Sequence, residues 1–504
     1  EINMFDSSVV SAGLDLLLDW QVLIVMICSS LYGLFIGAMP GLTATMAVAL
    51  LIPITFYMPP IPAIASIITM SAMAIFAGDI PGTLVHIPGT PSSAAYCDDS
   101  YSLAKKGKAA VVLGTNVTLS VLGGLCGSLI LTSMAPILAE VAMQFSSFEF
   151  FWLVCIGLSC AVLISAASPL KGFISLLVGL LITCIGLDIT LCFPRFTFDR
   201  PELFEGFSFI PAMIGMFGMA EIFKNVSEKQ SALEKVTIQS MNIFSGMLGR
   251  IRGWWKQIFR SGILGTLVGV LPGAGADIAA WICYGVAKKF SKHPEEYGKG
   301  SLEGIANSAA ANNAALSGAF IPALVFGIPG DSITAIVIGV LFMKGLEPGP
   351  NLFQNSPEFL FAIYMVFILA NLLMLPLGYL AIRLATKVMY VPTNLLHPII
   401  VGFCVVGAFA INNTNFDVMA MLGFGVLAYF MIANGFPVAP AILGLVLGKM
   451  LENTFMQSML KSEWDLTAFF DRPISATLGV ITFALWLSPF FMKMIKKAIA
   501  KRIA

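Results

Sequence analysis

The chain has 504 residues, of which 58% are hydrophobic and only 11% are charged, and its basic and acidic side chains balance to a net charge of zero. Soluble domains carry about 25% charged residues, so this composition excludes an ordinary soluble protein. The balanced charge also gives no indication of a nucleic-acid partner.

Apolar segments recur along the whole chain, and the run from Gln21 to Gly78 contains no charged residue. Such segments predict membrane-spanning helices, because lipid offers the backbone no hydrogen-bond partner and the segments do not alternate as barrel strands do. The expected segments are 20–38, 42–58, 61–77, 109–139, 148–167, 172–193, 207–223, 258–271, 274–287, 305–328, 332–343, 358–380, 395–411, 417–433, 436–451 and 474–492. Several are shorter than a crossing requires. We therefore expect an all-α polytopic membrane protein with about 11 to 13 transmembrane helices, including broken or re-entrant segments.

Basic residues are concentrated in two places, the segment from Lys224 to Arg260 and the C-terminal tail that begins at Lys493. Because positively charged loops stay in the cytoplasm, both places are expected on the cytoplasmic side. No basic residue precedes Lys105, which favours an N-terminus on the outer side.

Three short motifs occur twice in the same order. The first pairs Gly33, Gly37, Pro40 and Gly41 with Gly265, Gly269, Pro272 and Gly273; the second pairs "IPGTPSSA" (87–94) with "IPGDSITA" (328–335); the third pairs Lys106-Gly107 with Lys344-Gly345. This order indicates a duplication, and we expect two homologous halves of inverted topology. The halves are predicted at 1–223 and 258–504, the latter including C-terminal helices and the basic tail, with a basic cytoplasmic connecting loop at 224–257.

The Pro-Gly motifs interrupt segments that would otherwise be continuous helices. Pro lacks an N–H group and Gly admits unusual backbone shapes, so a break exposes carbonyls before it and N–H groups after it. Paired breaks in an internal repeat are typical of secondary transporters, in which half-helix N-termini face anionic solutes and loosened carbonyls bind cations. The alternative interpretation is that these positions are kinks or points of close helix packing.

Small polar residues and glycines cluster at the breaks and supply the candidate substrate-binding residues. These are Gly41, Thr43, Thr45, Gly89, Thr90, Ser92, Gly273, Gly275, Asn312, Asn313, Gly330 and Ser332. Asp277 and Asp331 are the ion-coupling candidates, because ionisable groups near membrane depth are usually functional. The asparagines have an alternative role in helix–helix hydrogen bonding, and the two aspartates have one as helix caps.

Nucleotide-binding and hydrolase motifs do not occur. "GLVLGKM" (444–450) has neither the spacing nor the hydroxyl of a P-loop, and HExxH and GxSxG are missing. We therefore expect no enzyme, no cofactor and no metal beyond a coupling Na⁺. A membrane-embedded enzyme acting on lipid, or a channel-like structural subunit, is the alternative function.

Taken together, the motifs resemble a known family. The duplicated "GxxxGxxPG", "LPGAGADIA" (271–279), "YGKGSLEG" (297–304), "NNAA" (312–315), "GIPGD" (327–331) and "GLEPGP" (345–350) resemble the large transmembrane subunit of tripartite tricarboxylate transporters, the TctA family. The likeness extends over nearly the whole chain and includes "FPVAPAILGLVLG" (436–448).

The resemblance implies a permease in the bacterial cytoplasmic (inner) membrane. Its partners would be a small transmembrane subunit and a periplasmic solute-binding protein. Its solutes would be di- or tricarboxylates such as citrate, imported by symport with Na⁺ or H⁺.

Overall fold

A computed structural model describes residues 6–39, 42–164, 168–188, 190, 192–227, 243–273, 275–388 and 393–487. Within these ranges seven helical segments are long and apolar enough to cross a membrane: Trp20–Gly37, Pro60–Val85, Cys97–Ala142, Leu302–Phe326, Pro357–Ala385, Asn415–Ala433 and Val438–Lys461. Shorter apolar helices accompany them, among them Ala44–Phe56 and Ser332–Met343. The predicted all-α polytopic architecture is confirmed.

The chain divides into two compact units. The first unit contains Glu1–Glu140 and Ser208–Ala433, and the second contains Val141–Phe207 and Asn434–Ala504. Both duplicated sets of motifs therefore belong to the first unit.

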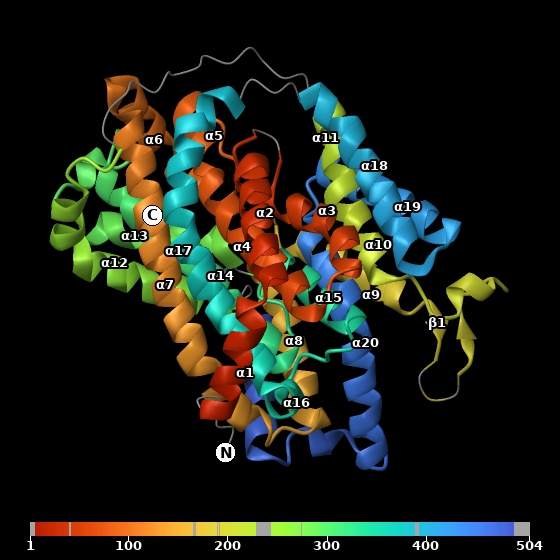
Figure 1. The fold of residues 1–504 in the computed structure, drawn as a ribbon. Coiled ribbons are helices and arrows are strands. Elements are labelled where there is room, and N and C mark those ends of the chain that lie inside the picture. The colour runs from red at the N-terminus through yellow and green to blue at the C-terminus, as the bar shows by residue number, and fades with distance from the viewer. Residues whose placement is uncertain are drawn as a thin grey trace, which may run out of the picture. The chain divides into compact units, whose positions relative to one another are not determined.

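The first unit is built entirely of helices (Figure 1). Those before the second unit are α1 (Ser7–Leu18), α2 (Trp20–Gly37), α3 (Ala44–Phe56), α4 (Pro60–Ala77), α5 (Asp79–Val85), α6 (Cys97–Leu103) and α7 (Ala109–Ala142). Those after it are α10 (Phe209–Met213), α11 (Ala220–Ser227), α12 (Met247–Val270), α13 (Gly275–Phe290), α14 (Leu302–Phe326), α15 (Ser332–Met343), α16 (Pro350–Asn355), α17 (Pro357–Val388), α18 (Thr393–Asn412) and α19 (Asn415–Ala433).

The duplicated glycines bring two helix pairs into close contact, α2 with α4 and α12 with α14. A Cβ atom on Gly33 would lie 2.4 Å from the Met70 carbonyl oxygen, and one on Gly265 would lie 2.4 Å from that of Ala311. Gly37 and Gly269 meet Ala74 and Ala315 in the same way. Small residues at this spacing let helix backbones approach closely in membranes. The glycines of the repeat are thus packing positions, and both helices end directly after them, α2 at Gly37 and α12 at Val270.

The second unit contains α8 (Ser147–Ile164), α9 (Pro169–Thr183), α20 (Val438–Lys461) and the apolar helix Pro473–Leu487. The apolar stretch 172–193 was expected to be helical throughout, but α9 ends at Thr183. A short antiparallel hairpin follows, with Gly186 (β1, Gly186–Leu187) paired with Arg195 (β2, Pro194–Arg195). Gly186 has φ +133°, which a helix cannot accommodate, and Pro194 lacks the N–H that a helix interior needs.

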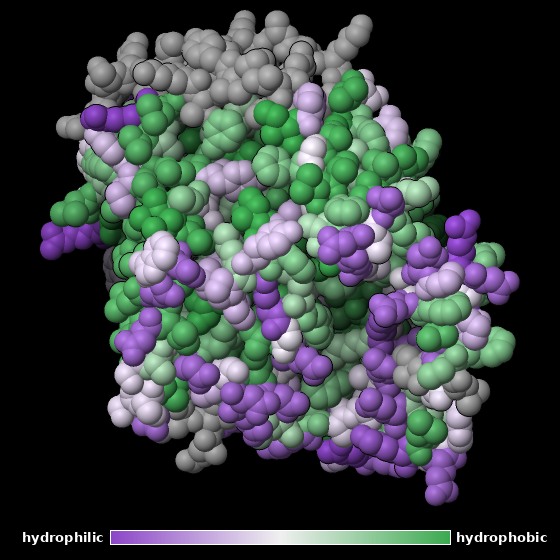
Figure 2. Space-filling view, turned by 45° about the vertical axis from the view of Figure 1, so that its right-hand side comes forward, coloured by the Kyte–Doolittle hydropathy of each residue, from purple (hydrophilic) through white to green (hydrophobic). Residues whose placement is uncertain are grey.

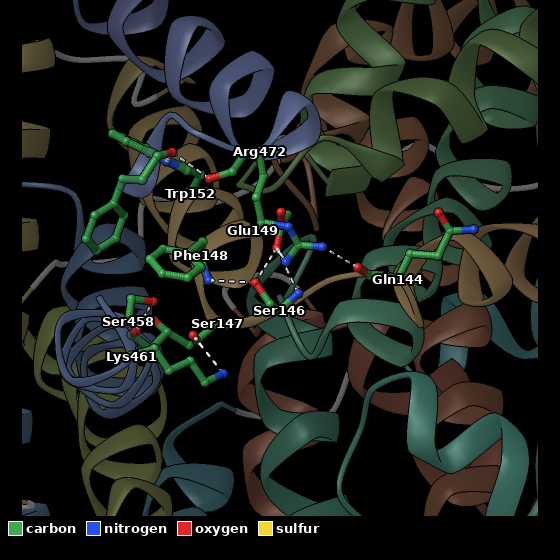
Figure 3. Close-up of polar contacts among 12 residues, drawn as sticks. Gln144, Ser146, Ser147, Phe148, Glu149, Trp152, Ser458, Lys461 and Arg472 are labelled. Carbon is green, nitrogen blue, oxygen red and sulfur yellow. Dashed lines mark hydrogen bonds and ion pairs between the residues drawn. The ribbon is translucent and has the colours of Figure 1, made fainter. Parts of the chain in front are cut away.

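A buried carboxylate joins α8 to the C-terminal part of the second unit (Figure 3). One Glu149 oxygen accepts hydrogen bonds from the Ser146 N–H at 2.8 Å and the Ser146 hydroxyl at 2.6 Å, and it pairs with the Arg472 guanidinium at 3.0 Å. Arg472 also donates to the Gln144 carbonyl. Phe469, which accepts a hydrogen bond from the Trp152 indole, packs on the same helix.

Apolar residues cover much of the face of the molecule in Figure 2. Trp20, Leu18, Leu129 and Leu181 each expose more than 60% of their surface. Exposed apolar area on this scale is unfavourable in water and indicates contact with lipid.

Candidate functional site

The break after α12 is a sharp turn held by the other duplicated motif of the same half. Gly273 has φ +81° and donates its N–H to the Gly330 carbonyl at 2.8 Å, and Gly275 has φ +52° at the start of α13. The corresponding break after α2 includes Pro40 and Gly41, which lie outside the described residues. The residues directly after it are described, and there the Thr43 hydroxyl caps α3 by accepting the Met46 N–H. Each break is therefore followed by a new helix N-terminus, as the sequence predicts.

The two "IPG" motifs form matching turns. His86 and Gly327 both adopt the left-handed conformation, with φ 61° and 68°. The N–H groups of the next residues, Ile87 and Ile328, donate back to Pro81 and Pro322.

Each turn then contains the same reciprocal pair of hydrogen bonds, which caps α15 in the second half and precedes the short 3-10 helix Ser93–Ala95 in the first. The Thr90 hydroxyl accepts the Ser93 N–H while Ser93 accepts the Thr90 N–H. Asp331 and Thr334 exchange the same two bonds at 2.8 and 2.9 Å. Asp331 thus acts as a helix cap, which was the alternative role considered for it.

The halves meet at these elements. The helix α13, which follows the break in the second half, contacts η1 (Ser93–Ala95) beside the first "IPG" turn, and α3 contacts α15 in the reciprocal manner. The Trp281 indole on α13 donates to the Pro91 carbonyl at 3.2 Å. The Ser92 backbone N–H interacts with the Asp277 carboxylate. The segment 87–92 and the start of α13 therefore form one site.

Two carboxylates lie at this junction. Asp277 is exposed and Asp331 is half-buried, and each lies within the electrostatic range of the other. A Cβ on Gly275 would come 2.6 Å from the Asp331 Cβ, so only glycine admits Asp331 here. Within the described ranges, no group of three His, Cys, Asp or Glu residues is arranged to hold a metal ion.

The adjacent asparagines of α14 face different neighbours. The Asn312 amide interacts with the Tyr96 hydroxyl, which donates to an Asp79 carboxylate oxygen at 2.6 Å. Asn313 instead places its amide nitrogen 3.7 Å from the Met374 sulfur on α17. The side-chain oxygens of Asn312 and Asn313 have no hydrogen-bond partner in the described part of the chain. Asn312 is therefore linked to the first half, and Asn313 faces α17.

The structure brings several candidate residues into one place: Thr90, Ser92, Gly273, Gly275, Asp277, Gly330 and Asp331. Gly89 joins them because its N–H donates to the Gly78 carbonyl and a Cβ on it would come 3.1 Å from the Gly37 carbonyl oxygen. Thr45 and Ser332 lie half-buried at the starts of α3 and α15.

Sequence reasoning did not select Asp79, Tyr96 or Trp281 for the site. For Asp79 a signal was present, because it is the first charged residue after the uncharged run from Gln21 to Gly78. Tyr96 and Trp281 carry no such pattern.

A separate cavity of about 480 Å³ lies among α2, α3 and α18. Residues such as Ile24, Leu50, Ile399 and Phe403 line it. Its almost wholly apolar wall does not suit a carboxylate solute.

Comparisons with known proteins show which family the chain belongs to. The chain is 36% identical over 456 residues to an Agrobacterium vitis protein described as "Uncharacterized 52.8 kDa protein in TAR-I ttuC' 3'region", covering 90% of each chain. It is 39% identical over 228 residues to an "Uncharacterized protein in TAR-II ttuC' 3'region" of the same organism, covering 45% of this chain and 94% of that one. No solved structure matches. Residues 23–443 match the model of the tripartite tricarboxylate transporter TctA family, and the chain belongs to that family.

Proposed function

We propose that this chain is the permease of a binding-protein-dependent secondary transporter that imports di- or tricarboxylates with a cation gradient. The observation that carries the proposal is the junction of the two halves, where Trp281 of α13 donates to the Pro91 carbonyl at 3.2 Å and the Ser92 N–H faces the Asp277 carboxylate. There a backbone N–H beside a helix break already interacts with a carboxylate, which is the chemistry a carboxylate solute needs. The pairing joins the two halves, the place where transporters of duplicated fold bind their solutes.

Asp277 and Asp331 would repel a multiply charged anion on their own. A positive ion bound with the solute removes this repulsion, and coupling to Na⁺ or H⁺ follows from the same charges. The two aspartates remain the candidates for binding a coupling Na⁺ at the junction.

The proposed partners are a small transmembrane subunit and a periplasmic solute-binding protein. The proposed location is the bacterial inner membrane, with a cytoplasmic C-terminus. The basic tail on which that orientation rests, like residues 228–242 of the predicted basic loop, lies outside the described residues. The family model names a tripartite transporter, and this supports additional subunits.

The test is uptake by proteoliposomes that hold the chain with its small membrane subunit and the solute-binding protein. Citrate, malate, succinate and glutarate are offered under Na⁺ or pH gradients without ATP. Accumulation of at least one carboxylate that collapses when both gradients are dissipated is expected. Uptake that persists without a gradient, or at full rate without the binding protein, contradicts the proposal.

A matched pair of variants on α14 tests the site itself. Asn312→Ala removes a side chain whose oxygen is unpartnered, and we expect its apparent affinity for the carboxylate to fall about tenfold, the equivalent of about 1.4 kcal/mol. Asn307 on the same helix is equally buried, but its amide bonds to Ser261 and to the Glu303 carbonyl. Asn307→Ala should therefore change the folded fraction and leave the affinity of that fraction unchanged. Equal affinity losses in the two variants would remove Asn312 from the site.

A further inference from the structure

Four acidic side chains are buried in the described part of the chain: Asp79, Asp99, Glu149 and Asp417. A buried carboxylate requires hydrogen-bond donors or a positive partner, because desolvation disfavours its charged form. The donors around each carboxylate therefore indicate whether it serves the fold.

Three of the four have several donors. Asp99 accepts the N–H groups of Gly300 and Ser301 at 2.7 and 3.0 Å and the Tyr284 hydroxyl at 2.6 Å. Asp417 accepts from the Asn412 amide and the Thr414 hydroxyl. Glu149 has the Ser146 donors and Arg472. Each of the three carboxylates is thus held by at least two donors, although one Glu149 oxygen has no partner among the described residues.

Asp79 is different. It is 3% exposed and accepts one hydrogen bond, from the Tyr96 hydroxyl, while its second oxygen has no partner among the described residues. In the described part of the chain no basic side chain pairs with it. A carboxylate held this way is stable when it carries a proton.

The elements packed against Asp79 supply few other titratable groups. α4 has none, and the segment around η1 and α6 supplies Tyr96, Cys97, Asp98, Asp99 and Tyr101. Asp98 is exposed and pairs with His86 at 2.8 Å, and Asp99 is satisfied by its own donors. Only Tyr96 and the Cys97 thiol are then close to Asp79, and neither neutralises a carboxylate.

Through Tyr96, Asp79 of the first half is connected to Asn312 of the second half. Tyr96 donates to Asp79 on one side and interacts with Asn312 of the other half on the other side. We propose, on the basis of the function proposed above, that Asp79 takes up and releases the coupling proton and that Tyr96 transmits its charge state to Asn312. Protonation converts the carboxylate to a neutral carboxyl group, and release of the proton restores the anion.

The geometry favours a proton over a metal cation. Hard cations such as Ca²⁺ and Mg²⁺ gather about six or more oxygen ligands. Around the Asp79 carboxylate the described residues supply one hydroxyl, from Tyr96, because the Thr83 hydroxyl is bonded to the Asp79 backbone carbonyl. Asp79 also has no counterpart in the other half, where Phe320 occupies the matching place before "IP".

The experiment compares two modes of uptake in proteoliposomes that hold the full transporter, with the carboxylate that the wild-type protein imports. One mode is accumulation against a gradient, driven by a pH difference. The other is downhill uptake at equal pH on both sides. At one proton per solute, one pH unit supports about tenfold accumulation. Asp79→Asn should lose this accumulation and keep downhill uptake.

Asp98→Asn is the matched control, because it removes the same charge from an exposed position on α6 and should accumulate as the wild type does. Normal accumulation by Asp79→Asn overturns the proposal. So does a wild-type protein that responds to Na⁺ and not to pH. If wild-type vesicles import no carboxylate at all, the proposed function fails before Asp79 is tested.

Asp79→Glu keeps a titratable carboxyl group if Asp79→Asn proves inactive in both modes. Accumulation by Asp79→Glu, with proton uptake reported by a pH dye inside the vesicles, supports the proposal. Downhill uptake by Asp79→Glu without accumulation, or no transport in either mode, overturns it.

Discussion

Glu149 in the second unit and Asp79 in the first are both buried acids on apolar helices, and each has one oxygen without a hydrogen-bond partner. They differ in the other oxygen. That of Glu149 has two donors from Ser146 and a guanidinium, whereas that of Asp79 has one neutral hydroxyl. The comparison indicates that burial alone does not distinguish a structural acid from a functional one. Glu149 and Asp79 differ in the number and the charge of the hydrogen-bond donors around the carboxylate.

Asp99 allows the same comparison within a single unit. Like Asp79 it lies in the first unit and has no basic partner, but three donors from the "YGKGSLEG" segment and α13 surround it. Gly300 has φ +123°, a backbone conformation that favours glycine, and its N–H and that of Ser301 both reach the carboxylate. Mutations at these acids can therefore change the number of hydrogen-bond donors and the charge of the donors separately.

The largest effect is expected from Arg472→Ala. Glu149 would remain buried without its cation, and breaking a buried ion pair costs about 3 kcal/mol or more. We expect a loss near the lower end of that range, because Arg472 is partly exposed. The measurement is the native fraction of the purified protein on denaturant titration in detergent.

Lys461→Ala serves as the control. Lys461 is exposed in the same unit, and among the described residues it bonds only the Ser147 hydroxyl (Figure 3). Its loss should be below about 1 kcal/mol. Adding Glu149→Gln to Arg472→Ala should recover part of the lost stability. If the double variant is no more stable than Arg472→Ala alone, the uncompensated charge is not the cause.

Asp99→Asn should have the next largest effect. An amide at this position keeps one acceptor oxygen, so at least one of the three donors loses its partner, at a cost of about 1 to 3 kcal/mol for an unsatisfied buried group. The same denaturant titration measures it. Tyr284→Phe removes one donor and should cost less. A stability equal to that of the wild type in Asp99→Asn would show that donor number does not distinguish these acids.

The sequence was sufficient for the architecture and for the repeat. Long uncharged segments and paired Pro-Gly motifs depend on local chemistry, and the breaks after α2 and α12 follow from Pro and Gly alone. The hairpin after α9 was missed because 184–193 is apolar, and hydropathy does not register a glycine with positive φ.

The site was predicted less well, for a physical reason. Motif reasoning selects residues near breaks, such as Ser92 and Asp277, and these do meet. It cannot predict which carboxylate will accept hydrogen bonds from residues that are distant in the sequence. Asp331 forms a cap with a threonine three residues away, which is a local pattern, but Tyr96 reaches Asp79 from 17 residues away and Asn312 from the other half. Such contacts depend on the packing of α5 and α14 against α6.

The smallest effect on stability is expected from Asp79→Asn. The asparagine oxygen still accepts from Tyr96, and the substitution removes an acid that no cation compensates, so we expect a change within about 1 kcal/mol of zero. Under the same titration Asp99→Asn should be clearly less stable than Asp79→Asn, although both acids are buried in the first unit. Tyr96→Phe adds a check, because it leaves the Asp79 carboxyl group with no hydrogen-bond donor among the described residues. If Asp79→Asn destabilises the protein as much as Asp99→Asn does, the single Tyr96 bond supports the fold. Asp79 then belongs with Glu149 and Asp99 among the structural acids.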